Sequence, residues 1–389
     1  MDITQQGVIA LLKAAITGER AALPETFDLS AALQRMQNHH VVPLLYEGAF
    51  RCGISPVEPV MQQLFRTSCR ILIRSEGQMR DVRRICAAFD ENGIDYLPLK
   101  GCRMKALYPR PELRLMGDAD ILIRTEQYDR IRPVMQQLGF REGEETVHEL
   151  IWESDNLYLE LHKQMIPSYN EDLYTYFGTG WQRAVRESGN RYALTAEDEW
   201  IFLFTHFAKH FRDGGIGCRH VVDLWVYLRA CPEMDEAHIR AGLGSMQLLE
   251  FYDNIRRLLD VWFGGGESDE KTELISQLIF SSGSFGAEEM RLLSRTIRDA
   301  DKGDKKRNGR LVYFCRTAFP DVTTLRGKYR VLQKAPWMLP AVWVYRPFYK
   351  FFAEGERLKK HQRNLEVLTD EKMDARREIL HCVGLDYRF

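Results

Sequence analysis

The sequence predicts an α+β protein, with a small sheet and its helices between mainly helical N-terminal and C-terminal regions. Three observations predict this class. Apolar residues recur at helical spacing through residues 1–88, and helical spacing returns from residue 166 to residue 389. Between them, short β-branched runs bounded by turn residues fill residues 89–165. We therefore expect an N-terminal helical region at 1–88, a sheet-containing core at 89–165 and a C-terminal helical domain at 166–389.

The composition is typical of a folded globular protein. The chain has 389 residues, of which 45% are hydrophobic and 28% are charged, and this balance excludes a disordered chain. The formal net charge of −1 provides no global basic field for duplex nucleic acid. Eight scattered cysteines without a C-x-x-C pair are typical of reduced thiols, so we expect a cytoplasmic protein. We also expect no secretion signal and no transmembrane segment.

Helical signals begin near the N-terminus. Asp28 is a suitable cap for the helix that follows it. Residues 57–80 and 78–92 continue the helical pattern as two segments. His39 and His40 lie between predicted helices, and we expect them to be exposed loop histidines, with contact to a nucleotide as the alternative.

The first strand of the core is expected at residues 94–99. Pro98 within it indicates a sheet edge or a strand end, because proline has no N–H group to donate. Lys100 and Gly101 follow where this strand meets a helix. Backbone N–H groups at a helix start suit phosphate, and glycine permits close approach. The alternative is an ordinary turn without a ligand.

Carboxylates in two apolar strands are the strongest chemical signal in the sequence. Asp118 and Asp120 lead into a β-branched strand and share one face, because alternate residues of a strand point the same way. Two residues along a strand span roughly 6.5–7 Å, so both carboxylates can share one divalent ion or a pair of ions. Glu160, in the alternating strand at 157–162, points to the same side as His162. The Asp pair alone could be a solvated turn, but an unpaired buried glutamate is costly, so the three acids together favour a metal site.

A polar loop at residues 109–114 precedes the acidic strand. Arg114, nearest to that strand, could neutralise a triphosphate, because guanidinium matches phosphate geometry. The alternative is a surface arginine or an ion pair with Asp118. A helix is then expected at 126–138 with Thr125 as its cap. We expect the strands after this helix to form two antiparallel partners on one side of the acidic strand.

A family resemblance emerges from the order of these features. In sequence order the chain has Leu-Lys-Gly at 99–101, Leu-Tyr-Pro at 107–109, Arg114, Asp-x-Asp at 118–120, Leu-Gly-Phe at 138–140 and Leu-Glu-Leu-His at 159–162. This order resembles the bacterial uncharacterised nucleotidyltransferase family, part of the DNA polymerase beta-like nucleotidyltransferase superfamily. The resemblance covers about residues 85–165 in the catalytic segment, and similar helical features continue to about residue 355.

The resemblance implies a small mixed nucleotidyltransferase sheet and a two-metal enzyme. Carried across, the metal ligands and catalytic residues would be Asp118, Asp120 and Glu160, holding Mg²⁺ or Mn²⁺. The nucleotide-binding residues would be Lys100, Gly101, Arg114, His210 and Arg219. The implied reaction moves a nucleoside monophosphate from an NTP such as ATP to a hydroxyl of an unidentified acceptor, which could be a small molecule, an RNA or a protein, and releases pyrophosphate. The chain departs from the superfamily at residues 100–102, where Lys-Gly-Cys stands in place of the usual Gly-Ser. The way in which the chain binds phosphate therefore stays open.

Two helices after the core complete the expected site. His206 and His210 share one helix face, and Phe207 replaces the glutamate of an H-E-x-x-H motif, which argues against a catalytic zinc site. A similar histidine-bearing helix recurs in the family, and the next helix fits as well. The residues expected to line the wall that faces the nucleotide or acceptor are Lys209, His210, Arg219 and Asp223. Polar pairing between the two helices is the alternative, and it stays open.

The C-terminal part carries one unusual segment. Residues 335–352 are rich in aromatic and basic residues, which is compatible with a weak membrane or protein contact or with packing back on the protein. Residues 370–382 are expected to form an amphipathic helix. Two functions of other classes stay open for the whole chain: a catalytically degenerate nucleotide-binding protein that regulates a partner, and a helical interaction protein whose acids are structural.

Overall fold

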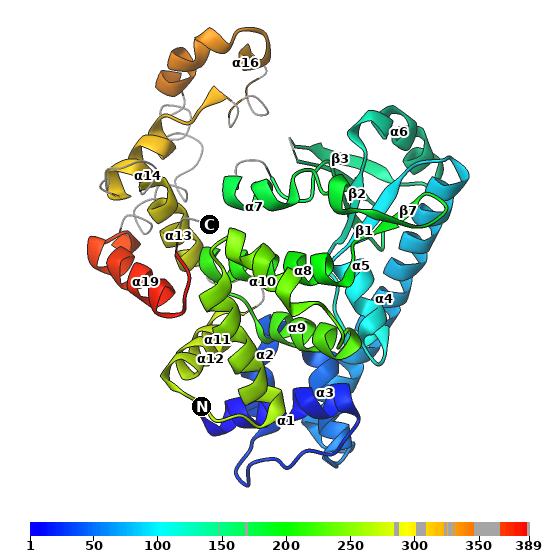
Figure 1. Ribbon diagram of the computed structural model, residues 1–389, viewed down its shortest axis with the longest axis vertical. Helices are drawn as coiled ribbons and strands as arrows, with labels where there is room; N and C mark the ends of the chain where they lie inside the picture. The colour runs from blue at the N-terminus through cyan, green and yellow to red at the C-terminus, as the bar shows by residue number, and fades with distance from the viewer. Residues whose placement is uncertain are drawn as a thin grey trace. The chain divides into compact units, whose positions relative to one another are not determined.

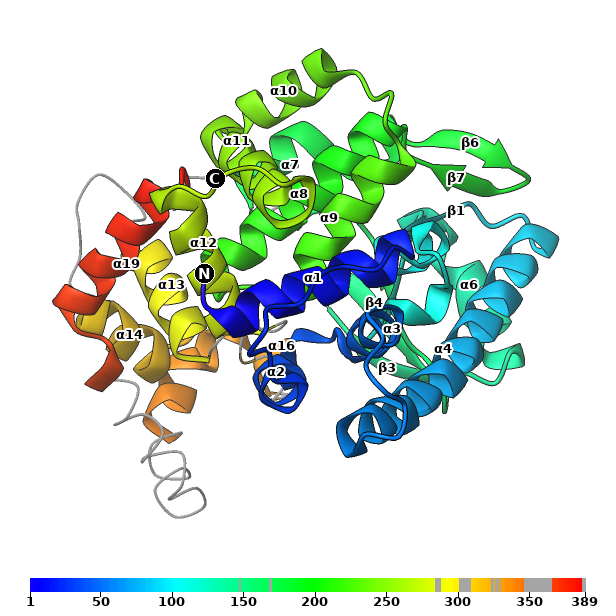
Figure 2. The same cartoon turned by 90° about the horizontal axis from the view of Figure 1, so that it is seen from below.

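Figures 1 and 2 show the computed structural model, which divides into two compact units. The first unit comprises residues 1–211 and 215–285, and the second comprises residues 212–214 and 286–387. The structure describes residues 1–146, 148–167, 170–283, 288–300, 309–322, 325, 329, 331–345 and 366–386. Every site residue predicted from the sequence lies in the first unit.

The N-terminal region is helical, as predicted. Its helices are α1 (Ile3–Thr17), α2 (Leu29–Met36), α3 (Val42–Arg51) and α4 (Pro59–Glu91). Asp28 caps α2, because its side chain accepts hydrogen bonds from the N–H groups of Ser30 and Ala31. The two segments expected at 57–80 and 78–92 are wrong, since α4 is one helix of 33 residues. Gly77 does not break α4, and it makes room for the Asn156 side chain, which a Cβ at that position would meet.

Within the described residues, the first unit contains a mixed sheet of seven strands in the spatial order β3-β4-β5-β2-β1-β7-β6. The strand bounds are β1 (Tyr96–Leu99), β2 (Ala119–Ile123), β3 (Arg141–Glu145), β4 (Glu149–Glu153), β5 (Tyr158–His162), β6 (Val185–Ser188) and β7 (Arg191–Ala193). β2 runs antiparallel to β1 and parallel to β5. The expected α+β class with a mixed sheet is therefore confirmed.

The sheet differs from the sequence-based expectation in its strand neighbours. β1 is an interior strand and not an edge, and Pro98 is tolerated because β7 pairs with β1 only at Tyr96. β5 is parallel to β2 and not antiparallel, because α6 (Tyr128–Gln137) and the β3–β4 hairpin lie between them in the chain. Thr125 does not cap α6; it begins a short 3₁₀ turn, Thr125–Gln127, that precedes the helix.

Strands β6 and β7 lie in the region that was expected to be entirely helical. They are only four and three residues long, which is too short for a two-residue alternation to stand out in the sequence. They pair with each other antiparallel, and β7 adds them to the central sheet beside β1. The sheet therefore extends beyond the expected core of residues 89–165.

One face of the sheet is covered by α4 and α6, which Figure 2 shows beside each other. The shared core contains Val82, Ile85 and Phe89 of α4, Ile131, Val134 and Met135 of α6, and the strand residues Ile121, Ile123, Leu159 and Leu161. Because strand side chains alternate, Asp120 and Glu160 point away from this core to the opposite face. The burial of the apolar residues thus fixes the direction of the two acids.

Helices follow the sheet along the rest of the first unit. Their bounds are α5 (Gly101–Met104), between β1 and β2, and then α7 (Glu171–Phe177), α8 (Ala196–Asp213), α9 (Cys218–Ala230), α10 (Glu236–Ser245), α11 (Leu249–Leu259) and α12 (Glu270–Ser282). Phe204 of α8 packs against Phe251 and Tyr252 of α11. This contact fixes the rotation of α8, so that His206 and His210 emerge on a neighbouring face of the helix.

The second unit is helical in the residues that the structure describes. Its helices are α13 (Glu288–Ala300), α14 (Gly309–Ala318), α16 (Val331–Lys334) and α19 (Asp370–Cys382). α19 matches the amphipathic helix that we expected at residues 370–382. Its Met373 packs in a small core with Leu293, Ile297 and Leu368.

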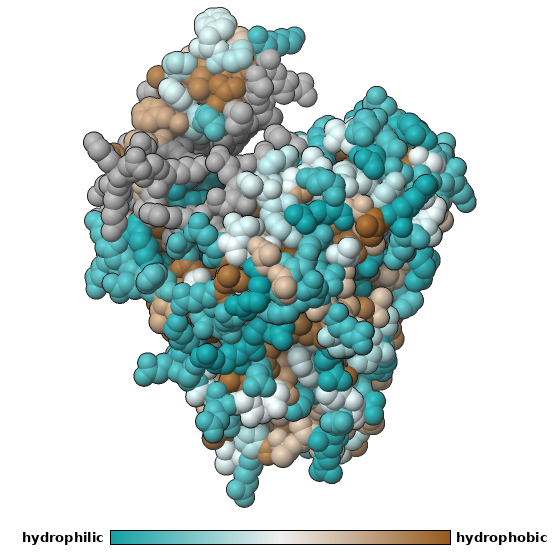
Figure 3. All heavy atoms as spheres, viewed as in Figure 1, coloured by the Kyte–Doolittle hydropathy of each residue, from teal (hydrophilic) through white to brown (hydrophobic). Residues whose placement is uncertain are grey.

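The aromatic segment at 335–352 is described only as far as Tyr345, and residues 346–352 lie outside the described residues. Trp337 is 80% exposed, whereas Val342 is buried against Leu325 and Leu332. Figure 3 shows hydrophobic atoms gathered around α16 on the face it displays. A membrane or protein contact at this segment stays a prediction. In the described parts of the chain, the helices are too short or too polar to cross a bilayer.

His39 connects the N-terminal helices to α9. It is 2% exposed, so our expectation of an exposed loop histidine was wrong. Its Nδ1 accepts a hydrogen bond of 3.2 Å from the backbone N–H of Cys218, the first residue of α9. Burial lowers the pKa of His39 to about 4, so the ring is neutral near pH 7 and keeps its acceptor nitrogen.

We predict that mild acid destabilises the protein through His39. Its pKa is about 4 in the folded state and about 6.5 in an unfolded chain, so the unfolded chain binds the proton first. Stability is therefore lost as the pH falls from about 6.5 through about 4, by about 1 to 3 kcal/mol. Chemical denaturation of the wild type and His39→Gln over this range measures the effect. A stability difference between them that does not vary with pH would contradict it.

Candidate active site

Asp120 and Glu160 lie directly opposite each other on neighbouring parallel strands. The register of β2 and β5 pairs Asp120 with Glu160, and adjacent strands are about 4.8 Å apart. Asp120 is only 4% exposed, whereas the Glu160 side chain is 20% exposed. The expectation that a third acid comes from a neighbouring strand therefore agrees with the observed register.

His162 completes this group from the same face of β5. Its Nε2 lies 2.8 Å from Asp120 Oδ1 and 3.4 Å from Glu160 Oε2. Among the described residues, the set of three side chains whose ligand atoms all lie within 4.8 Å of one another is Asp120, Glu160 and His162. Sequence reasoning placed His162 beside Glu160 but did not assign it as a ligand. The alternation of side chains along β5 that identified Glu160 could also have identified His162, because both side chains lie on one face.

Opposite charges determine the protonation of this group. Burial alone would raise the pKa of Asp120, but Lys100 and His162 hold it well below its usual range. Burial alone would lower the pKa of His162, but its hydrogen bonds with Asp120 and Glu160 raise the pKa to about 9. These contacts favour the charged carboxylate of Asp120 and the protonated imidazole of His162, and a cation bound at the two carboxylates would displace the proton from His162.

Asp118 lies just before β2 and is exposed to solvent. Desolvation by the surrounding protein, with repulsion from Asp120 and Glu160, raises the pKa of its carboxyl group. Asp118 is thus electrostatically coupled to the two strand acids, although it is not in the group of three whose ligand atoms converge. A bound cation would relieve this repulsion.

Lys100 reaches Asp120 from the end of β1. Its Nζ donates to Asp120 Oδ1 at 3.0 Å. Its backbone has φ 39° and ψ −109°, a conformation that favours glycine. Such strain costs about 1–3 kcal/mol and persists only where the surroundings enforce it. The attraction of Asp120 outweighs burial and raises the pKa of Lys100, so the ammonium stays charged.

Gly101 begins α5, which has only four residues, so this helix adds little dipole to the site. A Cβ at Gly101 would lie 3.0 Å from the Met116 side chain and 3.2 Å from Arg114. The glycine therefore allows the loop before β2 to pack closely. Its predicted contact with a nucleotide stays a prediction.

Arg114 forms a buried ion pair with Asp223 of α9. Its Nε and Nη2 donate to the two Asp223 carboxylate oxygens at 2.8 and 3.0 Å. The Tyr108 hydroxyl donates to Oδ1 of the same carboxylate at 2.6 Å, and Arg219 Nη1 donates to Oδ2 at 3.2 Å. The ion pair considered as the alternative for Arg114 therefore exists, but with Asp223 and not with Asp118. This network ties the loop before the acidic strand to α9.

Helices α8 and α9 carry a cluster of basic side chains, which we call the basic cluster: His206, Lys209, His210, Arg219 and His220. His206 and His210 bring their Nε2 atoms to 3.0 Å, and Arg219 Nη2 lies 3.0 Å from His220 Nε2. Among the described residues, no group forms a hydrogen bond with the buried Arg219 Nε. Sequence reasoning did not single out His220.

Burial and neighbouring positive charges determine the protonation of the histidines His206 and His220. Burial, with the charges of His210, Lys100 and nearby groups, lowers the pKa of His206 well below its usual value. Burial, Arg219 and His210 do the same for the pKa of His220. Because positive neighbours disfavour a metal cation here, the cluster is better suited to phosphate than to zinc.

Electrostatic coupling connects the basic cluster to the acids. The charge of Lys100 acts both on Asp120 and on His206. After burial, the charges of Lys209 and His162 lower the pKa of His148. The acids and the basic cluster are therefore near enough to each other for their charges to interact.

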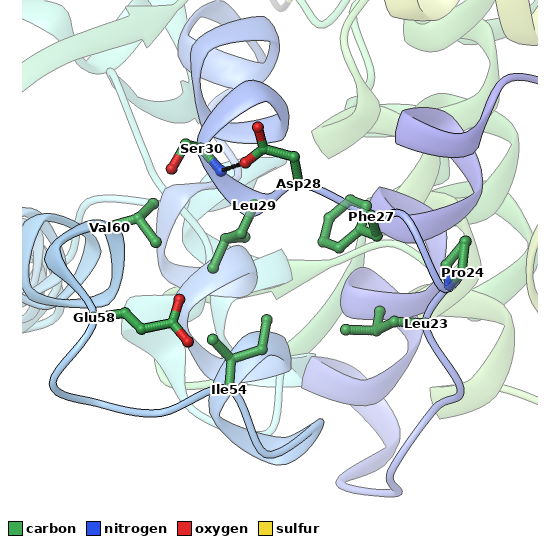
Figure 4. Close-up of a pocket in the computed structure, with 9 residues that line it drawn as sticks. All are labelled: Leu23, Pro24, Phe27, Asp28, Leu29, Ser30, Ile54, Glu58 and Val60. Atoms are coloured by element: carbon green, nitrogen blue, oxygen red, sulfur yellow. Dashed lines mark hydrogen bonds between the residues drawn. The ribbon is translucent and has the colours of Figure 1, made fainter.

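A separate cavity of about 410 Å³ lies in the N-terminal region. Figure 4 shows the Asp28 side chain hydrogen-bonded to Ser30 at the start of α2, so this carboxylate serves as a helix cap. None of the predicted site residues lines the cavity. The residues that do are Leu23, Pro24, Phe27, Asp28, Leu29, Ser30, Ile54, Glu58 and Val60.

Comparisons with known proteins give one family match. A sequence model of the family described as "Uncharacterised nucleotidyltransferase" matches residues 25–264, a range that includes both the acidic strands and the basic cluster. The solved structure of the antibiotic-resistance factor ANT(2'')-Ia is similar at 15% sequence identity and a TM-score of 0.33, over 47% of this chain and 96% of that chain. No match was found among curated protein sequences.

We predict that Asp223 is essential for stability. Asp223→Ala leaves Arg114 and Arg219 without their carboxylate, and removing one partner of a buried ion pair costs about 3–5 kcal/mol. The matched control is Asp253→Ala, which breaks the exposed pair with Arg240 and should cost about 0–1 kcal/mol. Denaturant unfolding measures both variants. Equal losses of unfolding free energy in the two variants would contradict this prediction, because the Asp223 network would then stabilise the protein no more than an exposed ion pair.

Proposed function

Because the chain belongs to the uncharacterised nucleotidyltransferase family, we propose that it is a metal-dependent enzyme that transfers a nucleoside monophosphate from an NTP to an acceptor hydroxyl. The observation that carries this proposal is the pairing of Asp120 with Glu160 across two parallel strands, away from the apolar core. Lys100, Asp118 and the basic cluster support it, because a nucleotide needs both a cation site and groups that bind phosphate.

The acids fit the metal ions that such a reaction requires. In this proposal Asp118, Asp120 and Glu160 hold one Mg²⁺ or Mn²⁺, and Asp118 and Asp120 hold a second. Carboxylate oxygens are the ligands that these ions prefer. When bound, the ions neutralise the charge that develops on the phosphate oxygens. The raised pKa of Asp118, caused by desolvation and then by repulsion from Asp120 and Glu160, agrees with a site that gains from added positive charge.

The proposed reaction is an in-line displacement at the α-phosphorus. The acceptor hydroxyl oxygen forms a bond to the α-phosphorus, the bond from that phosphorus to the bridging oxygen breaks, and pyrophosphate leaves. In our proposal, a Glu160 carboxylate oxygen accepts the hydroxyl proton. Its position would make it effective, since the Glu160 side chain is the more exposed of the acid pair.

The basic cluster and Lys100 would bind the triphosphate. Arg219 and His210 are the main candidates on α9 and α8, and no group in the described part of the chain forms a hydrogen bond with the buried Arg219 Nε. Arg114 would act through Asp223, by fixing the position of Arg219. Gly101 would permit the close approach of the phosphates to the chain. ATP is one nucleoside triphosphate that could donate the nucleotidyl group. No contact among the described residues selects one nucleobase over another.

A second candidate is a nucleotide-binding protein without turnover that regulates a partner. The observation that favours it is the ion pair of Lys100 with Asp120, because an ammonium already neutralises the carboxylate that would bind a metal. Under this alternative, the nucleotide binds with a metal but pyrophosphate is not released with any acceptor. A purely structural role for the acids would give no dependence on metal.

We predict that a metal ion and an NTP together raise the thermal unfolding midpoint of the wild type. A ligand that binds only the native state adds about 2.7 kcal/mol at 100 times its Kd. The rise should vanish in the double variant Asp118→Asn/Asp120→Asn and persist in the control Asp253→Asn, whose carboxylate lies on the surface of α11. Each NTP is tested with Mg²⁺ and with Mn²⁺. A well-folded wild type whose midpoint no NTP raises would contradict the proposal.

A further inference from the structure

The donor atoms around Asp120 are not all oxygens. His162 Nε2 lies between the carboxylates, 2.8 Å from Asp120 Oδ1 and 3.4 Å from Glu160 Oε2. The ligand atoms of these three residues lie within 4.8 Å of one another, a spacing at which one ion can contact all of them. The imidazole side chain is 12% exposed, so it is held in place and not free in solvent.

The strands fix this arrangement before any ion binds. Glu160 and His162 are alternate residues of β5 and share a face, and the register places Asp120 opposite Glu160. The apolar partners Leu159 and Leu161 are buried in the core on the other face. A one-residue shift of β5 would bury Glu160 and His162 in that core, so the packing of the leucines enforces the three-donor geometry.

A purely structural role explains His162 less well. Lys100 already donates to the same Asp120 oxygen at 3.0 Å. His162 is therefore not the only group that compensates this carboxylate. The imidazole instead lies within reach of both acids, on a face where Tyr158 is 41% exposed and solvent can enter.

We infer that His162 Nε2 is the third protein ligand of the metal ion at Asp120 and Glu160, and that this centre prefers Mn²⁺ or a related transition metal to Mg²⁺. The inference rests on the proposed function and adds one imidazole to the carboxylates that hold the ion at Asp120 and Glu160. Mg²⁺ strongly favours oxygen ligands. Sites with nitrogen and oxygen donors bind first-row transition metals with an affinity that rises from Mn²⁺ through Fe²⁺ and Co²⁺, so the His162 ring disfavours Mg²⁺ and favours these ions, with Mn²⁺ the weakest of them.

Pulsed electron paramagnetic resonance of bound Mn²⁺ tests this inference directly. A nitrogen nucleus bound to Mn²⁺ modulates its spin echo, and an oxygen ligand does not. The wild type should show directly bound nitrogen, and labelling its histidines with nitrogen-15 should change the modulation to that isotope. This labelling needs no substitution, so it remains decisive even if a variant fails to fold.

Two substitutions identify the histidine. His162→Gln should lose the nitrogen signal and bind Mn²⁺ at least about tenfold more weakly, since even indirect partners of a metal contribute about 10- to 100-fold. Its preference for Mn²⁺ over Mg²⁺ should also fall, measured by competition. The matched control is His148→Gln, because His148 is the neighbouring histidine whose pKa is affected by His162. It should keep both the signal and the affinity.

The outcomes separate this inference from the proposed function. Mn²⁺ that binds through Asp120 without any nitrogen signal would overturn the inference and leave the nucleotidyltransferase proposal standing. A nitrogen signal that survives in His162→Gln, or that disappears in His148→Gln, would assign the ligand to another residue and also overturn it. No binding of Mn²⁺, with or without an NTP, would overturn both.

Discussion

The buried carboxylate of Asp120 is the interaction on which the rest of the site depends. A carboxylate that is 4% exposed must be compensated, because an isolated buried charge is very costly. Its Oδ1 contacts both Lys100 and His162. Lys100 adopts an unfavourable backbone conformation at the end of β1, and His162 is held by the pairing of β5 with β2. Three neighbouring strands therefore converge on this one oxygen.

The surrounding helices extend this arrangement to a second set of charges. The ion pair of Arg114 with Asp223 joins the loop before β2 to α9, and aromatic packing of Phe204 fixes α8. In the basic cluster, burial and then the neighbouring positive charges lower the pKa values of His206 and His220, while Lys209 and Arg219 contribute positive charge. The acids would be stabilised by a metal ion, and the basic cluster would be stabilised by phosphate. A metal ion with a triphosphate supplies both charges at once.

The sequence predicted the elements with strong local signals and missed those set by distant contacts. Alternation in the apolar strands was enough to place Asp120 and Glu160 on one face, and the α+β class followed from the same patterns. The partner of Arg114 was not predictable, because Asp223 lies 109 residues further along the chain. The strained backbone of Lys100 has no signal in the local sequence, because a φ of 39° is unusual for any residue other than glycine. β6 and β7 were missed because they are too short to show a periodicity.

The most direct test of nucleotidyl transfer follows the α-phosphate. The wild type is incubated with Mn²⁺ and an NTP labelled at the α-phosphorus, with pooled small-molecule, RNA and protein fractions as acceptors, and both label transfer and pyrophosphate are measured. Our account predicts that the label joins an acceptor as pyrophosphate appears. Asp120→Asn should do neither while its fold, checked by its thermal midpoint, is intact. Retained transfer in Asp120→Asn, or a wild type that transfers nothing, would contradict the account.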